Sequence, residues 1–233
     1  MKSQISLLLV FFSSFISFSQ IGPNDEAVFI DSLNNMGTAE NYKFIRVIKD
    51  FTEEKELYDV AFYSRSGKIE RRSQTTNKYF MAFEGPCVYY YENGNRKKME
   101  TYSDKKINGK QYEWYENGAI KLESEVVHDK KTNNSTTKII HYWNTNNEQK
   151  VINGEGEYEE IEIVPNSNFT KFNIKSSGKI KNYFKDGLWT GESENPKYNF
   201  YEQFENGKLT SGKRIDSSGV TISYNEVFQR PKP

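Results

Sequence analysis

Along most of the chain, apolar and polar residues alternate one by one, and the spacing of three to four residues that marks a helix is rare. Arg96–Tyr102 and Ile120–Val127, for example, interleave Lys and Glu with Met, Leu and Val. Successive side chains of a strand point to opposite faces, so this alternation is typical of a half-buried sheet. The pattern predicts an all-β protein with a further strand over Asn41–Asp50, and Asp25–Met36 is the one stretch expected to form a short helix.

A tandem repeat organises the middle of the chain. Gly85–Gly94 reads GPCVYYYENG and Gly109–Gly118 reads GKQYEWYENG, a match at a shift of 24 residues that includes the whole YENG segment. Asn-Gly between alternating runs is a strong hairpin signal, and it predicts a two-residue type I′ turn. Each unit is therefore expected to be a strand, a turn and a returning strand.

Weaker copies of this unit flank the pair. An aromatic precedes the glycine in Phe62–Gly67, in Tyr183–Gly187 and in Tyr201–Gly207, whereas Tyr142–Lys150 looks like a copy whose turn has lost its glycine. About six hairpins with roughly 14–18 strands are expected from usual strand lengths. Consecutive antiparallel hairpin repeats would form an elongated twisted sheet, with a half-open barrel as the curled alternative.

The spacing of Gly, Tyr and Asn-Gly over residues 57–213 resembles the MORN repeat variant of exported bacterial proteins, which also occurs in a family described as antitoxin-like. The resemblance implies a β-hairpin repeat protein that acts by binding. The strand expected over Gly219–Phe228 and the Pro-rich end Gln229–Pro233 resemble the segment that leads into a TonB-like C-terminal domain, which does not follow in this sequence.

The N-terminus has the pattern of a secretory signal peptide. Lys2 precedes the apolar run Ile5–Ile16, which the small residues Ser17 and Ser19 follow. The run is shorter than the ~20 residues of a spanning helix, so we expect cleavage and no stable membrane insertion afterwards. The protein is then exported, either to the periplasm or out of the cell.

These features divide the chain into five parts. In order they are a signal peptide over 1–20, an N-terminal cap over 21–56, regular hairpin repeats over 57–127, degenerate repeats over 128–213, and a C-terminal strand with a Pro-rich tail over 214–233.

Composition limits the partners. The 32 Lys and Arg residues balance 32 Asp and Glu residues, so no net charge attracts the chain to nucleic acid. Hydrophobic residues make up only 35%, but 16 Tyr, 16 Phe and 3 Trp can bury large areas from few positions.

Aromatic side chains are the main candidates for a binding face. Strand periodicity places alternate rings on one side of each hairpin, where they would contact a partner. The alternative is that these rings pack between successive hairpins. The candidate residues are Tyr89, Tyr91, Tyr112, Trp114, Tyr115, Trp143, Trp189 and Tyr201.

Other reactive residues are few. Cys87, the single cysteine, is expected to be a small buried strand residue, and His128 and His141 lack the spacing of a zinc site. The acidic run Glu155–Glu162 is better explained by a charged strand face than by calcium, because a strand rarely wraps six oxygens around an ion. We expect no metal and no cofactor.

The sequence therefore favours a non-enzymatic exported scaffold that binds a protein or glycan in the cell envelope. An antitoxin or immunity protein that masks an exported toxin is the alternative, from the resemblance. A hydrolase with paired carboxylates stays open, because the separation of two carboxylates is a property of the fold.

Overall fold

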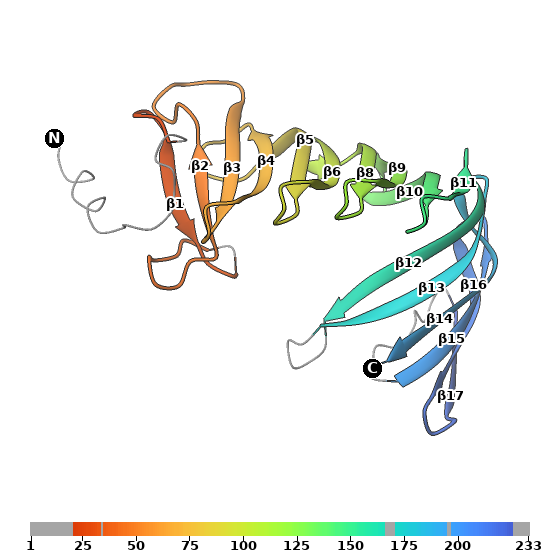
Figure 1. Cartoon of the computed structure of the whole chain (residues 1–233). Coiled ribbons are helices and arrows are strands. Elements are labelled where there is room, and N and C mark those ends of the chain that lie inside the picture. The colour runs from red at the N-terminus through yellow and green to blue at the C-terminus, as the bar shows by residue number, and fades with distance from the viewer. Residues whose placement is uncertain (1–20, 34, 166–170, 195–196, 226–233) are drawn as a thin grey trace. The chain divides into compact units, whose positions relative to one another are not determined.

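The computed structural model describes residues 21–33, 35–165, 171–194 and 197–225, and over these residues it contains strands and no helix (Figure 1). The signal peptide expected over 1–20 and the Pro-rich end lie outside the described residues. All the strand pairings are antiparallel, and most join strands that follow one another in the chain. In chain order the strands are β1 Glu26–Ile30, β2 Phe44–Ile48, β3 Tyr58–Ser64, β4 Ile69–Thr75, β5 Phe83–Tyr90, β6 Arg96–Ser103, β7 Lys106–Ile107, β8 Gly109–Trp114, β9 Ile120–Asp129, β10 Asn134–Trp143, β11 Gln149–Ile152, β12 Glu155–Pro165, β13 Lys171–Lys181, β14 Phe184–Glu194, β15 Lys197–Glu205, β16 Lys208–Asp216 and β17 Thr221–Tyr224.

The all-β prediction is therefore confirmed, and the 17 strands fall within the expected number. The strands form open sheet, not the half-open barrel of the curled alternative. The chain divides into two compact units, one made of Met1–Lys97 with Tyr102–Lys106 and the other of Lys98–Thr101 with Ile107–Pro233. We describe each unit by itself.

The first unit is built on β2 and β3, whose side chains are buried on both faces. Ile45, Val47, Ala61 and Tyr63 form a cluster on one face. Ile48, Tyr58, Val60 and Phe62 form a second cluster on the other face. Two-sided burial explains why apolar residues occupy both faces of these strands, which are interrupted only by Arg46 and Asp59 before the last residue of β3.

The helix expected within Asp25–Met36 is wrong. Glu26–Ile30 is strand β1, which pairs with β2 from Glu26 opposite Ile48 to Ile30 opposite Phe44. Five residues are too few for the apolar spacing to separate a helix from a strand, and pairing with a buried neighbour decides.

The second unit carries the longer strands, of which β12–β15 twist strongly (Figure 1). One face is buried around Leu122, Tyr142, Val151, Tyr158, Ile180 and Trp189. A second cluster on β12–β15 comprises Val164, Phe172, Ile174, Tyr198 and Phe200. The opposite face of β12–β16 is exposed.

The two strongest turns differ from the prediction. At Gly94 the backbone N–H donates to Tyr91 O (2.9 Å) and Tyr91 N–H donates to Asn95 O (2.8 Å). Only Gly94 has a positive φ, 88°, so this is a three-residue loop with a left-handed glycine and not a type I′ turn. The turn at Gly118 has the same bonds.

The same loop explains the copy that has no glycine. Asn147 N–H donates to Asn144 O and Asn144 N–H donates to Glu148 O, both at 3.0 Å. Asn147 takes the left-handed position with φ 62°. Asn tolerates this region better than other residues with a side chain, so the hairpin survives the loss of glycine.

Two-residue turns with positive φ at both positions occur elsewhere, at Asn153-Gly154, Asn182-Tyr183 and Asn206-Gly207. Gly187, the glycine of the weaker copy Tyr183–Gly187, is not part of such a turn. Gly187 lies within β14, where it faces Phe204 of β15. The chain has already reversed at Asn182-Tyr183.

Candidate functional site

A row of exposed side chains crosses four strands of the second unit. Glu159 on β12 lies opposite Ser177 on β13, Ser177 opposite Thr190 on β14, and Thr190 opposite Tyr201 on β15. All four residues are exposed, with Tyr201 36% exposed. Neighbouring strands lie about 4.8 Å apart, so the row spans roughly 14 Å.

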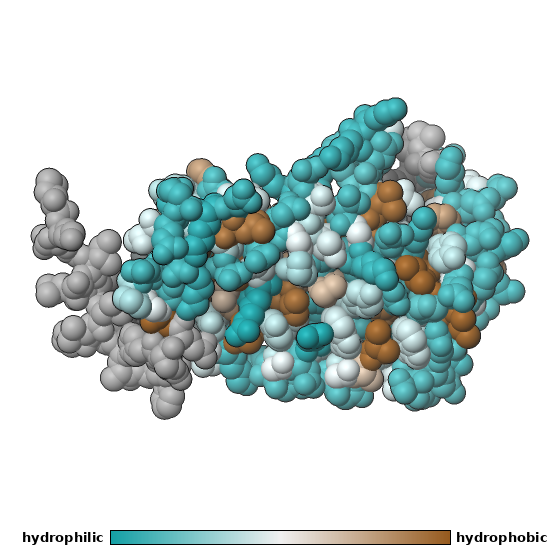
Figure 2. Space-filling model, turned by 90° about the horizontal axis from the view of Figure 1, so that it is seen from above, coloured by the Kyte–Doolittle hydropathy of each residue, from teal (hydrophilic) through white to brown (hydrophobic). Residues whose placement is uncertain are grey.

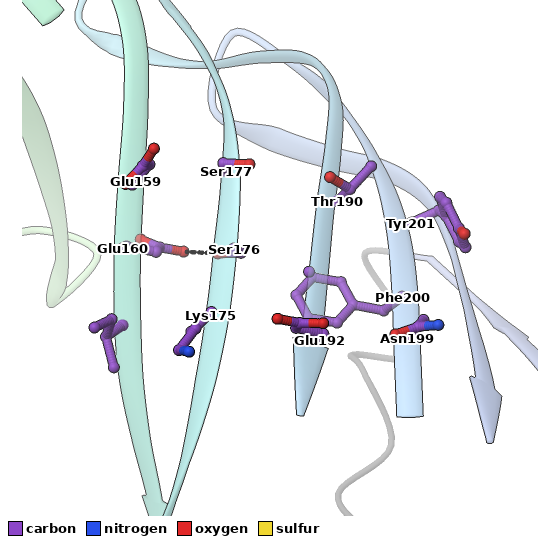
Figure 3. Close-up of a pocket in the computed structure, with 12 residues that line it drawn as sticks. Glu159, Glu160, Lys175, Ser176, Ser177, Thr190, Glu192, Asn199, Phe200 and Tyr201 are labelled. Atoms are coloured by element: carbon purple, nitrogen blue, oxygen red, sulfur yellow. Dashed lines mark hydrogen bonds between the residues drawn. The ribbon is translucent and has the colours of Figure 1, made fainter. Parts of the chain in front are cut away.

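A second exposed row runs beside the first. Ile161, Lys175, Glu192 and Asn199 are paired in register across the same four strands. The two rows line a hollow of about 670 Å³. Figure 3 shows the labelled side chains of both rows on successive strands.

The hollow follows from the sizes of these side chains. Ser177 and Thr190 are short and lie in the middle of their row, whereas Glu159 and Tyr201 are long and stand at its ends (Figure 3). A row with short central and long outer side chains leaves a depression on a flat sheet face. Strand twist adds to it.

The residues beneath the hollow hold its floor in place. Phe200 on β15 is 1% exposed, and it lies against Gly191 on β14, where an added Cβ would come within 2.1 Å of Phe200 Cζ. Trp189 is wholly buried against Gly178, and its indole N–H donates to Lys179 O at 3.1 Å. These two rings therefore bury part of this face by lying over glycines of the neighbouring strands.

Polar contacts fix the edge of the floor. Ser176 Oγ donates to Glu160 Oε1 at 3.0 Å, and Lys185 Nζ forms an ion pair with the same oxygen. Lys185 Nζ also lies 4.1 Å from the centre of the Trp189 ring. Glu160 therefore has partners, and it is a structural residue in this arrangement.

Glu159, Lys175, Glu192 and Asn199 offer charged and amide groups, and three hydroxyls come from Ser177, Thr190 and Tyr201. Lys213 Nζ stands 4.9 Å from the centre of the Tyr201 ring, which fixes that ring at the rim. Such a surface can form many hydrogen bonds to a ligand and one contact with an aromatic ring.

The buried face of the second unit has a groove of its own, of about 710 Å³. Its lining includes Glu100, Gln111 and Ser124, which are 7%, 5% and 3% exposed. Burial raises the pKa of Tyr158 in this lining, and the charges of Glu160 and Glu113 raise it further. The carboxylates Glu100 and Glu113 in this lining are paired with Lys98 (2.8 Å) and Lys121 (2.9 Å).

The predicted aromatic residues do not come together in one site. Tyr89 and Tyr91 belong to the first unit, where Arg71 and Lys97 stand over their rings at 5.7 and 5.5 Å. Tyr112 and Trp114 stack on β8 with ring centres 6.0 Å apart. Only Tyr201 lines the hollow.

Three of the predicted residues serve the fold. Tyr115 donates its hydroxyl to Trp143 O at 2.7 Å, and Trp143 packs against His141 with ring centres 5.8 Å apart. Trp189 is 0% exposed and cannot contact a partner, so its assignment to a binding face is corrected. The reason is Gly178, which leaves room for the indole on the neighbouring strand.

The residues that we interpreted as structural from the sequence are buried or hydrogen-bonded within the fold. Cys87 is 0% exposed. His128 Nδ1 lies 3.0 Å from Ser135 Oγ, and His141 Nδ1 lies 3.1 Å from Gln149 Nε2. Glu155 accepts the backbone N–H of Asn182 at 2.8 Å.

Within the described ranges, no group of three or more His, Cys, Asp or Glu residues is arranged to hold a metal ion. The same residues include no helix with the length and apolarity needed to span a membrane. Figure 2 shows that hydrophobic residues form small islands on a mainly hydrophilic surface in this view.

Comparisons of the chain with protein families, with curated proteins and with solved structures found no match. The resemblance to MORN-type repeats stays a prediction.

Sequence reasoning missed Ser177, Thr190 and Asn199, which form the middle and one end of the hollow. None of these residues is unusual in its own segment. These residues form a recognisable row only when β13, β14 and β15 are aligned in register. The periodicity of the sequence does not give that register.

Proposed function

We propose that this protein is an exported, non-catalytic binding scaffold whose hollow on β12–β15 takes a hydroxyl-rich ligand, a glycan of the cell envelope. The observation that carries the proposal is the row Glu159, Ser177, Thr190 and Tyr201. A glycan presents many hydroxyls that both donate and accept hydrogen bonds. The row and its neighbours present carboxylate, amide, ammonium and hydroxyl groups within one hollow.

The lining residues of the hollow support a sugar over a wholly apolar ligand. Most of the residues that line it carry polar side chains, and the lining also includes the ring of Tyr201 at one end and Ile161 in the second row. A specific site combines a few directed polar groups with an apolar contact that fixes orientation. The hydroxyls of Ser177 and Thr190 stand at the base, where a ligand would displace water.

The export expected from the sequence supports the same choice of ligand. The pattern of Lys2, the apolar run and the small residues is that of a signal peptide, and a protein outside the cytoplasm meets envelope glycans directly. The non-catalytic part of the proposal rests on the sequence, which offers no set of nucleophile, base and orienting residue.

A matched pair of substitutions tests the proposal. Ser177 lies in the hollow, and Ser223 lies on the same face and in the same register row, two strands beyond Tyr201. Both serines are exposed strand residues. Phe is accepted well in strands, so Ser177→Phe fills the hollow while Ser223→Phe changes the same face elsewhere.

The purified protein is applied to a glycan array, and binding of the strongest ligand is then measured by titration calorimetry. We expect Ser177→Phe to raise Kd at least about tenfold, a loss of roughly 1.4 kcal/mol, and Ser223→Phe to leave it unchanged. An array without ligands, or equal Kd values for both variants, would overturn the proposal. Release of shortened sugar from the bound ligand would contradict a non-catalytic scaffold.

A further inference from the structure

The first unit presents two aromatic side chains to solvent at the tip of one loop. Tyr79 and Phe80 are 63% and 76% exposed, and they lie between β4 and β5. Large apolar side chains that stand together in solvent mark an interaction site more often than single ones do. We call Asp50–Leu57 and Asn77–Met81 together the aromatic tip.

Hydrogen bonds from its own residues hold this loop in one conformation. Asn77 Oδ1 accepts the backbone N–H groups of Tyr79 (2.8 Å) and Phe80 (2.9 Å). Thr75 is 0% exposed, and its hydroxyl oxygen accepts Ala82 N–H at 3.1 Å and donates to Asn77 O at 3.0 Å. The two rings are thus presented on a fixed loop, which lowers the entropy lost when a partner binds.

The neighbouring Lys78 shows which chemistry the tip accepts. Its ammonium lies 5.4 Å from the centre of the Phe51 ring, 5.8 Å from that of Tyr58 and 5.7 Å from that of Tyr79. Glu54 Oε1 accepts from it at 2.6 Å, and this hydrogen bond raises the pKa of Lys78. A cation between aromatic faces and a carboxylate is a favourable arrangement.

The loop beside the two rings is acidic. Asp50, Glu53, Glu54 and Glu56 occur within eight residues, and with Lys55 and Lys78 the tip has four carboxylates and two ammonium groups. Lys55 pairs with Asp50 at 2.7 Å and with Glu53 at 3.4 Å, so the excess charge of the tip is negative. The Glu53 and Glu54 side chains are 60% and 88% exposed. Exposed rings and carboxylates therefore share one end of the unit, and Phe51 contacts Tyr79 edge to face with centres 5.7 Å apart.

We propose that the aromatic tip docks an arginine- or lysine-rich segment of a partner polypeptide. Guanidinium and ammonium groups stack on exposed aromatic faces and form charge-assisted hydrogen bonds with carboxylates, and the tip offers both together. The acidic loop disfavours an anionic membrane surface, which attracts basic segments. This inference concerns the first unit and does not rest on the glycan proposal.

The test uses a fluorescent synthetic peptide of about 12 residues with alternating Arg and Ser, and a control peptide in which citrulline replaces Arg. Citrulline keeps the shape of arginine and removes its charge. The full chain is titrated into each peptide and anisotropy is measured at low and high salt. We expect saturable binding of the arginine peptide alone, weakened by salt.

Substitutions test whether the arginine peptide binds at the aromatic tip. The double variant Tyr79→Ser with Phe80→Ser is expected to weaken binding at least about tenfold, since buried aromatic contacts dominate such interfaces. Glu56→Lys, at an exposed position of the tip, is expected to weaken it as well. Leu33→Ser, at a residue 78% exposed outside the tip, and Glu92→Lys, in the turn after β5, are expected to leave the affinity unchanged.

Several results would overturn the inference. Equal binding of the citrulline peptide, no binding of either peptide, or an equal effect of Glu92→Lys and Glu56→Lys would each do so. The same holds if the double variant loses binding to phosphatidylserine vesicles that the parent chain retains. That result would assign the tip to membranes.

Discussion

Single glycines decide how this sheet buries its aromatic side chains. Gly212 on β16 lies opposite Glu202 on β15 and Tyr224 on β17. The Tyr224 ring crosses over Gly212, so that its hydroxyl donates to Glu202 Oε1 at 2.9 Å in a buried contact. Gly191 and Gly178 receive Phe200 and Trp189 in the same way.

Gly212→Ala should consequently destabilise the protein. A Cβ at this position would lie 2.3 Å from Tyr224 Cε2, so the ring must move and its hydrogen bond to Glu202 is strained. We expect a loss of about 1–3 kcal/mol in the free energy of unfolding, measured by urea denaturation. Ser211→Ala, on the exposed face beside it, should be nearly neutral, and equal losses for both variants would refute this explanation.

The same glycines show why residue roles were harder to predict than strands. Trp189 and Tyr201 look alike in the sequence, as aromatic residues of alternating segments. Trp189 is buried because its side chain points to the face where Gly178 leaves space, whereas Tyr201 points to the other face. Which face of a strand is buried depends on its pairing with other strands, so it cannot be predicted from one segment of the sequence.

At the scale of elements, the hairpins were predictable from Gly and Asn, but their geometry was not. Gly94 and Gly118 do reverse the chain where expected. Both the three-residue loop and the type I′ turn need a left-handed glycine, so the sequence signal is shared. The register of the flanking strands separates the two.

The loop between β4 and β5 gives a prediction at this scale. In Asn77→Ala the N–H groups of Tyr79 and Phe80 lose their shared acceptor, while Thr75 still anchors the base of the loop. We expect a loss of about 1 kcal/mol in stability and faster proteolytic cleavage at Tyr79–Phe80. Unchanged cleavage relative to the parent chain would show that other contacts order the tip. Asn93→Ala, in the turn after β5, is the control.

At the scale of the whole molecule, the two units differ in how they use their sheets. β2 and β3 of the first unit are buried on both faces, and its exposed aromatic residues are at a loop tip. The second unit buries one face and leaves the other open across β12–β15. The sequence predicted one kind of hairpin for both units. Alternation with a period of two identifies a strand, but it does not show whether one or both of its faces are buried.

The central claim is that the open face of β12–β15 binds a glycan at the hollow. The most direct test is an NMR titration of the labelled full chain with the oligosaccharide retained most strongly on the array. We predict that the amide shift changes centre on Ser177, Thr190 and Tyr201. Changes centred on Gln111 and Ser124 in the groove of the buried face, or no changes at all, would contradict the claim.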